Sequence, residues 1–404
     1  MSFSPLLLAS LLSPLSFTGA VWQNKDTHAL EGTGRGLEGL NGQYSALKAR
    51  KNLNKIRQRR YNSLQARHRD LLQQDLSMLR IEKVDRKNYK IQLTDHRSEY
   101  TGPIEIGTPG QGLDCIFDTG SSMAWVFSTK CRSSMCDMHT QFDATKSSTY
   151  SGSTTEMHIT FGTGSLRGVL AKDTVSLGGM SLHDQGFGEI LQPIGSVFQL
   201  DFDGICGMSY RMSKNVNASL LEGIERSSSL SEKSFTFYFG EKEAALVLGK
   251  AGRSLVNNQK MTWYPVTRQF YWESTLKDVK VGGKSILSTY SEGEISAVFD
   301  TGTSVLTMPT EDAGNTMALL QSSGVTCDMI EAGKAPKICY EFEGLDSICI
   351  RNWYERSIEG CTASLMTLDL TQENVFILGQ PFFNEFITTF DVGNNRIGVA
   401  PVRS

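Results

Sequence analysis

The sequence is poor in the residues that bind metal ions. Its 404 residues include only six histidines, and its eight cysteines form no Cys-x-x-Cys pair. Zinc sites draw on these residue types at short, regular spacings, and neither type shows such a spacing here. We therefore expect no metal and no other cofactor.

Long apolar runs are also scarce. The run from Pro5 to Phe17 is broken by Pro14 and followed by small residues up to Ala20. It is short for a membrane span but typical of a secretory signal peptide over residues 1–20. It lacks the usual positive residues at its start, so a signal anchor or an untargeted chain stays an alternative. No later stretch could span a bilayer, so we expect a mature protein of the secretory pathway, without stable membrane insertion.

Net charge is nearly absent, but its distribution is uneven. The chain carries −3 overall, whereas residues 21–87 carry +8 and residues 88–404 carry −11. Residues 44–87 also place leucines at spacings that fit helices, among many lysines and arginines. Composition alone would allow this basic segment to bind nucleic acid. Its position directly before an acidic body favours electrostatic binding to that body instead.

Two short stretches of the acidic body repeat each other. Residues 116–122 read IFDTGSS, and residues 298–304, 182 positions later, read VFDTGTS. Each has two apolar residues, then Asp and Thr-Gly, which predicts a buried strand that ends in a tight turn. Two copies in the same apolar frame are a strong signal for a pair of carboxylates, Asp118 and Asp300.

With these motifs the sequence resembles the pepsin-like aspartic proteases, the family of pepsin, cathepsin D, renin and the plasmepsins. The resemblance covers about Glu99 to Val402, roughly three quarters of the chain. Further motifs stand in the family's order: Ile106-Gly107-Thr108-Pro109, Trp125, Phe161-Gly162-Thr163-Gly164-Ser165, Phe202-Asp203-Gly204-Ile205-Cys206-Gly207, Ile377-Leu378-Gly379-Gln380 and Phe390-Asp391.

The resemblance implies an all-β, bilobal fold with a substrate cleft between two pseudo-symmetric lobes. Short alternating strands such as His158–Phe161 and Ser234–Phe239 agree with it, and one helix is expected over Glu311–Ser322. We expect an N-terminal lobe over 88–260 and a C-terminal lobe over 261–404. Residues 21–87 are then a partly helical, inhibitory prosegment, and the protein is a zymogen.

In this family the two Asp residues hold a water molecule and hydrolyse peptide bonds. Two carboxylates in contact cannot easily ionise together, so they share a proton and can supply both a base and an acid. We expect Asp118 and Asp300 to form this dyad. The resemblance gives supporting roles to their neighbours, which hold the loops together or donate hydrogen bonds to the carboxylates: Thr119, Gly120, Ser121, Thr301, Gly302 and Thr303.

A glycine-rich stretch, Phe161 to Ser165, resembles the family's flap, a hairpin that closes over the substrate. It lacks the lysine and the helix start of a phosphate-binding loop. Most relatives have a tyrosine at the position of Phe161, whose hydroxyl bonds the indole corresponding to Trp125, and Phe161 cannot make that bond. With the flap residues Phe161, Gly162, Thr163 and Gly164, we expect Trp125 and Ile205 to belong to the substrate-binding region.

Eight cysteines after a secretory start favour disulfides. The resemblance places one bridge between Cys131 and Cys136. Four later cysteines allow three pairings, and a hairpin expected around Glu343-Gly344 favours Cys339 with Cys349 and Cys327 with Cys361. The last two cysteines, Cys115 and Cys206, are either bridged or two buried thiols, and we favour the thiols.

The predicted function is therefore that of an aspartic endopeptidase that binds an extended peptide and acts at acidic pH. Its other expected partner is its own prosegment, and we expect a monomer that binds no nucleic acid. A peptide-binding relative without activity is the alternative, but both Asp-Thr-Gly copies are intact. Asn217-Ala218-Ser219 is one possible glycosylation acceptor.

Overall fold

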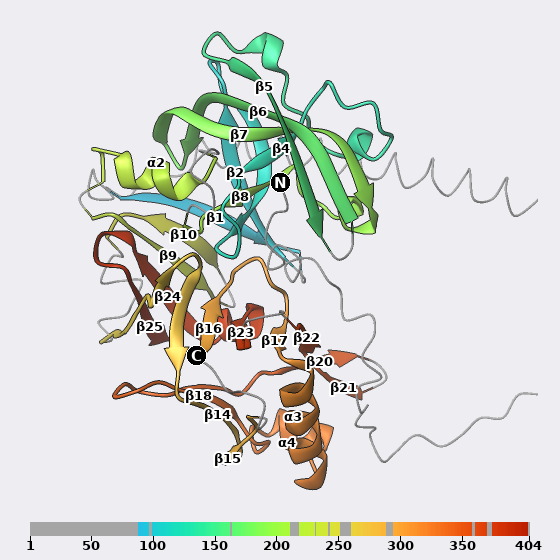
Figure 1. Ribbon diagram of the computed structural model, residues 1–404, viewed down its shortest axis with the longest axis vertical. Coiled ribbons are helices and arrows are strands. Elements are labelled where there is room, and N and C mark those ends of the chain that lie inside the picture. The colour runs from blue at the N-terminus through green and yellow to red at the C-terminus, as the bar shows by residue number, and fades with distance from the viewer. Residues whose placement is uncertain are drawn as a thin grey trace, which may run out of the picture. The chain divides into compact units, whose positions relative to one another are not determined.

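The computed structural model describes residues 88–96, 99–161, 164–210, 218–230, 232–240, 243–250, 260–287, 294–357, 360–369 and 374–402. The predicted signal peptide and prosegment lie outside these ranges, as does Asn217 of the possible glycosylation site. Within them strands dominate (Figure 1), which confirms the all-β prediction. No helix among the described residues is long and apolar enough to cross a membrane.

The largest sheet has thirteen strands in the part of the chain that the structure describes. Most neighbours are antiparallel, and the parallel pairs among the described residues are β3 (Gln111–Asp118) with β8 (Gly204–Gly207) and β4 (Trp125–Phe127) with β7 (Met180–Gly195). In spatial order the strands are β11 (Thr262–Pro265), β25 (Arg396–Pro401), β24 (Phe386–Asp391), β9 (Ser234–Phe239), β10 (Ala244–Leu248), β1 (Tyr89–Asp95), β2 (Tyr100–Ile106), β3 (Gln111–Asp118), β8 (Gly204–Gly207), β4 (Trp125–Phe127), β7 (Met180–Gly195), β6 (Gly164–Leu177) and β5 (Ser151–Phe161).

Three smaller sheets come from residues after 267. The six-stranded sheet runs β12 (Arg268–Gln269), β13 (Trp272–Leu276), β16 (Ile295–Phe299), β23 (Asn374–Leu378), β17 (Leu306–Met308) and β22 (Leu365–Thr367) among the described residues. The other two contain β15 (Lys284–Ser285), β14 (Asp278–Val281), β18 (Ile338–Glu341) and β19 (Ile348–Ile350), and β20 (Tyr354–Ser357) with β21 (Gly360–Ala363).

Helices are short. The predicted helix is present as α3, Thr310–Ser322, with Glu311 and Asp312 in its first turn, where acidic side chains stabilise the helix dipole. The remaining α-helices among the described residues are α2 (Leu220–Arg226), α4 (Cys327–Glu331) and α5 (Gln380–Phe383), and the short 3-10 turns are η2 (Cys136–Met138), η3 (Ala144–Lys146), η4 (Ser196–Gln199) and η5 (Val392–Asn394).

The large sheet combines strands from both sides of residue 260. Strands β24 and β25 follow that position in the chain, yet β24 pairs with β9, as the adjacent ribbons in Figure 1 show. Strand β10 (AALVL) is buried along its whole length, as expected for a strand in the interior of a sheet. The strands of the two halves therefore share a common sheet.

The two Asp motifs occupy equivalent places in their sheets. Strand β3 ends at Asp118 and pairs in parallel with β8, while β16 ends just before Asp300 and pairs in parallel with β23. Both strands are apolar and buried near these ends. Each carboxylate thus emerges from a buried strand at the end of a parallel pair, as the repeated sequence predicts.

Candidate active site

The two Asp-Thr-Gly loops meet through their threonines. Thr119 N donates to Thr301 Oγ1 at 3.1 Å, and Thr301 N donates to Thr119 Oγ1 at 3.0 Å. Each hydroxyl then donates across to the strand before the other motif, Thr119 Oγ1 to Phe299 O at 2.8 Å and Thr301 Oγ1 to Phe117 O at 2.6 Å. These four hydrogen bonds hold residues 182 positions apart in one rigid arrangement.

Both carboxylates are buried at this junction. The exposed fraction is 1% for Asp118 and 0% for Asp300. Gly120 N donates to Asp118 Oδ1 and Gly302 N donates to Asp300 Oδ1, each at 2.8 Å. Thr303 Oγ1 donates to Asp300 Oδ2 at 2.6 Å. The inner oxygens are therefore fixed in the same way in both loops.

Two polar atoms on the outer side of the first loop lack hydrogen bonds to the described residues. Asp118 Oδ2 and the Ser121 hydroxyl are buried but have no hydrogen-bond partner among the described residues. Thr303 occupies the place in the second loop that Ser121 occupies in the first, and its hydroxyl does bond Asp300. A buried carboxylate oxygen without a partner is costly, so Asp118 Oδ2 is suited to accept a hydrogen bond from an incoming group.

The two carboxyl groups shift each other's protonation. Burial raises the pKa of Asp300 well above its usual range, and the negative charge of Asp118 raises it further. Burial also raises the pKa of Asp118, while Ser121 and Asp300 act in the opposite direction. The pair therefore retains one proton over a wider pH range than two isolated carboxyl groups would.

Gly120 brings the first loop into contact with the second carboxylate. A Cβ atom at position 120 would lie 2.6 Å from Asp300 Oδ1 and nearer still to Oδ2 and Cγ. No side chain larger than hydrogen fits there unless the loops separate. The glycine of the first motif is thus required by the close approach of the two loops.

Ile205 lies on the strand next to the one that ends at Asp118, and Trp125 lies on the strand after that. Ile205 pairs with Ile116 of β3 and with Trp125 of β4, and both side chains are buried in a common apolar cluster. The Trp125 ring contacts Phe127, Phe198 and Phe202, but its Nε1 has no hydrogen-bond partner among the described residues. Apolar packing holds this indole in place.

The predicted flap falls on a hairpin. Strand β5 ends at Phe161 and strand β6 starts at Gly164, and these two residues form the last pair of the ladder. Strand β7 runs beside β6 as far as the pair of Gly164 with Gly195. Gly162, Thr163 and the side chain of Phe161 lie outside what the structure describes.

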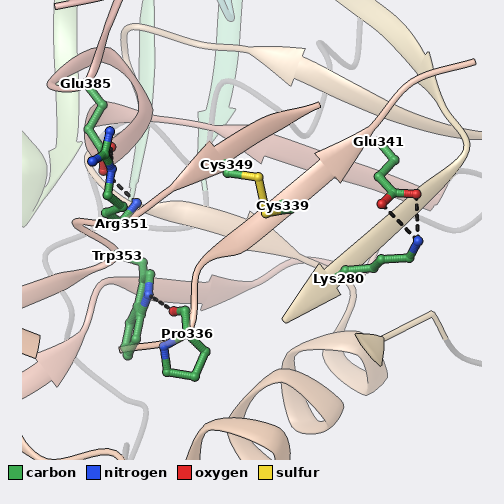
Figure 2. Close-up of a disulfide and its surroundings, with 8 residues drawn as sticks. All are labelled: Lys280, Pro336, Cys339, Glu341, Cys349, Arg351, Trp353 and Glu385. Carbon is green, nitrogen blue, oxygen red and sulfur yellow. Dashed lines mark hydrogen bonds and ion pairs between the residues drawn. A yellow bond between two sulfur atoms is a disulfide. The ribbon is translucent and has the colours of Figure 1, made fainter. Parts of the chain in front are cut away.

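Three disulfides are present, and they are the pairs expected from the sequence: Cys131–Cys136, Cys327–Cys361 and Cys339–Cys349. Figure 2 shows Cys339 and Cys349 joining β18 to β19, where they are directly opposite in the ladder.

Two cysteines keep free thiols. Cys115 and Cys206 are buried on the adjacent strands β3 and β8. Burial raises the pKa of the Cys115 thiol, and contact with Cys206 adds to the effect. As favoured from the sequence, both are buried thiols.

The donor atoms of Cys327, Glu331 and Cys361 lie within 4.8 Å of one another, the spacing of a metal site. Both cysteines of this group are joined in a disulfide, so their thiolates are not available as ligands.

Sequence reasoning missed one contact beside the two Asp-Thr-Gly loops. The turn between β12 and β13, at Phe270 and Tyr271, lies against Met208 and Ser209, which directly follow β8. No repeated motif marks this turn. Its aromatic run FYW was the available signal, because a cluster of large side chains next to a short strand indicates a packed contact.

The chain is similar to known proteins over most of its length. Residues 99–402 match the family model described as eukaryotic aspartyl protease. Pepsin A of Bos taurus is 34% identical over 320 residues, which cover 76% of this chain and 84% of the relative. Gastricsin of Mus musculus is 33% identical over 324 residues, which cover 75% of this chain and 81% of the relative.

Proposed function

Since the chain belongs to the eukaryotic aspartyl protease family, we propose that it is an active endopeptidase whose catalytic groups are Asp118 and Asp300. One observation carries the proposal. The two carboxylates are buried at the junction of two loops that four hydrogen bonds lock together. A relative that only binds peptides would have no need to retain such a pair.

The dyad holds one proton and one negative charge. The charged carboxyl takes a proton from a water molecule, which attacks the peptide carbonyl carbon, while the protonated carboxyl donates its proton to the carbonyl oxygen. Collapse of the resulting tetrahedral species breaks the C–N bond: one carboxyl gives the leaving nitrogen the proton that it took from water, and a hydroxyl of the tetrahedral carbon returns its proton to the other carboxyl. Asp118 Oδ2, buried and without a described partner, is the oxygen best suited to hold the water. The pair titrates as a unit, so base and acid roles belong to the dyad.

The substrate is an extended peptide of about six to eight residues, in a cleft between lobes 88–260 and 261–404. The β5–β6 hairpin covers it, and Phe161 supplies an apolar ring without a hydroxyl. Trp125 then needs no partner from the flap, which agrees with its packing among three aromatic rings. Closure of this flap depends on apolar contact and not on a tyrosine hydrogen bond.

The protein is made as a zymogen in the secretory pathway, with residues 21–87 as its prosegment. The +8 charge of that segment opposes the −11 of the body, and acid weakens their attraction by protonating carboxylates. From the sequence, the released segment ends between Arg80 and Asp95. Strand β1, Tyr89–Asp95, lies inside the large sheet between β10 and β2 and buries Ile91 and Leu93. Cleavage therefore occurs before Tyr89.

The test is peptide hydrolysis by purified protein at graded pH from about 3 to 7, with Asp118→Asn and Asp300→Asn as separate variants. Each substitution keeps the side-chain shape but removes an ionisable group, so each abolishes cleavage while circular dichroism stays unchanged. A wild type that binds peptides but cleaves none, with variants that bind equally well, would establish the inactive relative instead. Near wild-type turnover by either variant would refute the dyad.

A further inference from the structure

The turn between β12 and β13 is bonded to the segment that follows β8. Trp272 Nε1 donates to Met208 O at 2.9 Å, and Ser209 Oγ donates to Phe270 O at 3.0 Å. Trp272 and Ser209 are both fully buried. These two bonds point in opposite directions across the contact, so they fix the turn against residues 208 and 209.

Residues 208 and 209 in turn hold the first catalytic loop. Met208 N donates to Asp118 O at 2.8 Å, and Ser209 N donates to Ser121 O at 2.8 Å. A displacement of this segment is therefore passed directly to the backbone of Asp118. A single residue, Met208, thus links the turn to the backbone of Asp118.

The other end of the hairpin leads to the second carboxylate. Strand β13 pairs with β16, and Glu273 lies opposite Val298, two residues before Asp300. The Tyr271 ring packs with Val298 and Ile377 in a small apolar cluster. The hairpin is thus attached to the strand that carries Asp300 by a ladder and by side-chain packing.

The hairpin itself is stiffened at its open end. Arg268 donates through Nε and Nη2 to the two oxygens of Glu273, with 3.1 Å for the Nη2 bond, and Glu273 is almost fully buried. A bidentate pair of this kind fixes geometry as well as charge. A stiff element that touches both loops transmits force between them.

We propose that the β12–β13 hairpin is a second brace between the catalytic loops, in addition to the crossed threonines, and that Trp272 and Ser209 are positioning residues for the dyad. The inference rests on the proposed function. The threonines connect the loops directly, whereas the brace connects Asp118 to Asp300 through Met208, Trp272 and strands β13 and β16. Neither positioning residue touches the substrate.

Loss of a brace bond lets the two carboxyl groups move apart. Their charges then interact less, because Coulomb energy falls with distance, and the higher of the two apparent pKa values of the dyad falls. The rate falls too, since an attacking water held between the carboxyls is misplaced. A single hydrogen bond corresponds to a loss in kcat of roughly two- to twelvefold, with KM changed less than about twofold.

The first test compares two indole N–H groups. Trp272→Phe keeps an aromatic ring but removes the donor. Trp353→Phe is the matched control, because Trp353 is equally buried and its Nε1 donates to the backbone oxygen of Pro336 at 2.8 Å, as Figure 2 shows. We expect kcat and the upper limb of the pH profile to change in Trp272→Phe alone. Equal kcat losses in both variants, or an unshifted pH profile in Trp272→Phe, would overturn the brace.

The second test removes a hydroxyl. Ser209→Ala deletes the bond to Phe270 O, and Ser234→Ala is its control, because Ser234 Oγ donates to Gly249 O at 2.9 Å and is also buried. This pair decides the question if Trp272→Phe does not fold, since a change from Ser to Ala leaves no large cavity. The brace predicts a lower kcat in Ser209→Ala only, and unchanged kinetics would refute it.

A third measurement needs no substrate. Carbon-13 NMR titration follows the dyad carboxyls, assigned by their loss in Asp118→Asn and Asp300→Asn. The brace predicts that the higher of the two apparent pKa values of the dyad is lower in Trp272→Phe than in Trp353→Phe. An inactive wild type whose dyad still titrates this way would refute the proposed function and leave the brace standing. An active wild type with identical titrations in the two Trp variants would refute the brace and leave the proposed function standing.

Discussion

Substitution of Gly120 by alanine tests the close approach of the two loops. The added methyl group would stand 2.6 Å from Asp300 Oδ1 and closer to the rest of that carboxyl group. Ordinary contacts of a carbon atom lie near 3.5 Å, so the loops must separate by roughly 1 Å. The clash is with a buried carboxyl group whose oxygens are already bonded to Gly302 and Thr303, which leaves it little freedom to turn away.

Such a separation affects both rate and stability. A misplacement of about 1 Å at a reacting centre lowers a rate by roughly a hundredfold, so we expect kcat of Gly120→Ala to fall by about that factor or more. The hydrogen bonds between the threonines, 2.6 to 3.1 Å long, would stretch beyond bonding distance. Loss of two to four such bonds lowers the free energy of unfolding by about 2 to 4 kcal/mol.

The assay combines peptide hydrolysis with thermal unfolding. Gly314→Ala is the control, because Gly314 lies in helix α3 and nothing is within 4 Å of its added Cβ. That change should leave kcat unaltered and stabilise the helix by about 0.5 to 1 kcal/mol. If Gly120→Ala kept more than about a third of wild-type kcat, the tight contact between residue 120 and Asp300 would be wrong.

Four other features of the chain can also be tested: the protonation of Asp300, the activation site, the flap and the free thiols. Burial raises the pKa of Asp300, so the folded state holds a proton that the unfolded state releases, and wild-type stability is lost as pH rises through the folded pKa. Thermal unfolding of Asp300→Asn should lack this loss. Equal pH slopes of stability in the wild type and the variant would contradict it. Acid treatment of the full chain should give a mature N-terminus before Tyr89 by mass spectrometry, and a mature enzyme that retains residues 44–79 would exclude the prosegment. Phe161→Tyr should alter KM by less than about tenfold and should couple to Trp125→Phe in a double-mutant cycle, whereas Trp125→Phe alone should leave the kinetics nearly unchanged. Absence of coupling would show that the predicted flap does not face Trp125. The two free thiols should resist alkylation in the folded protein and react after unfolding, and rapid labelling of the folded protein would show that they are not buried.

The sequence predicts those parts of the site that local patterns encode. Each Asp-Thr-Gly loop follows its own buried strand, so a repeat of seven residues is enough to identify Asp118 and Asp300. The alternation of apolar residues likewise predicts β9, and Glu343-Gly344 between two cysteines predicts the hairpin that the Cys339–Cys349 disulfide joins. These features need only neighbours along the chain.

Contacts between distant segments could not be predicted in this way. The bond from Trp272 to Met208 depends on how two sheets are placed, and neither residue carries a motif. The packing of the Trp125 indole depends on Phe198 and Phe202, which lie far from β4 along the chain. Packing of this kind is decided by the whole fold, and periodicity in a single segment does not report it.

The shared sheet also has a consequence for synthesis. Strand β9 pairs with β24, so Phe235 meets Phe390 close to the C-terminus. A ribosome that has released only the first half of the chain therefore presents β9 with one unpaired edge, the kind of edge that recruits other chains. Removal of the last twenty or so residues would leave that edge exposed permanently. We thus expect C-terminal truncation to cause aggregation of the N-terminal half, although every residue of its own Asp-Thr-Gly loop is present.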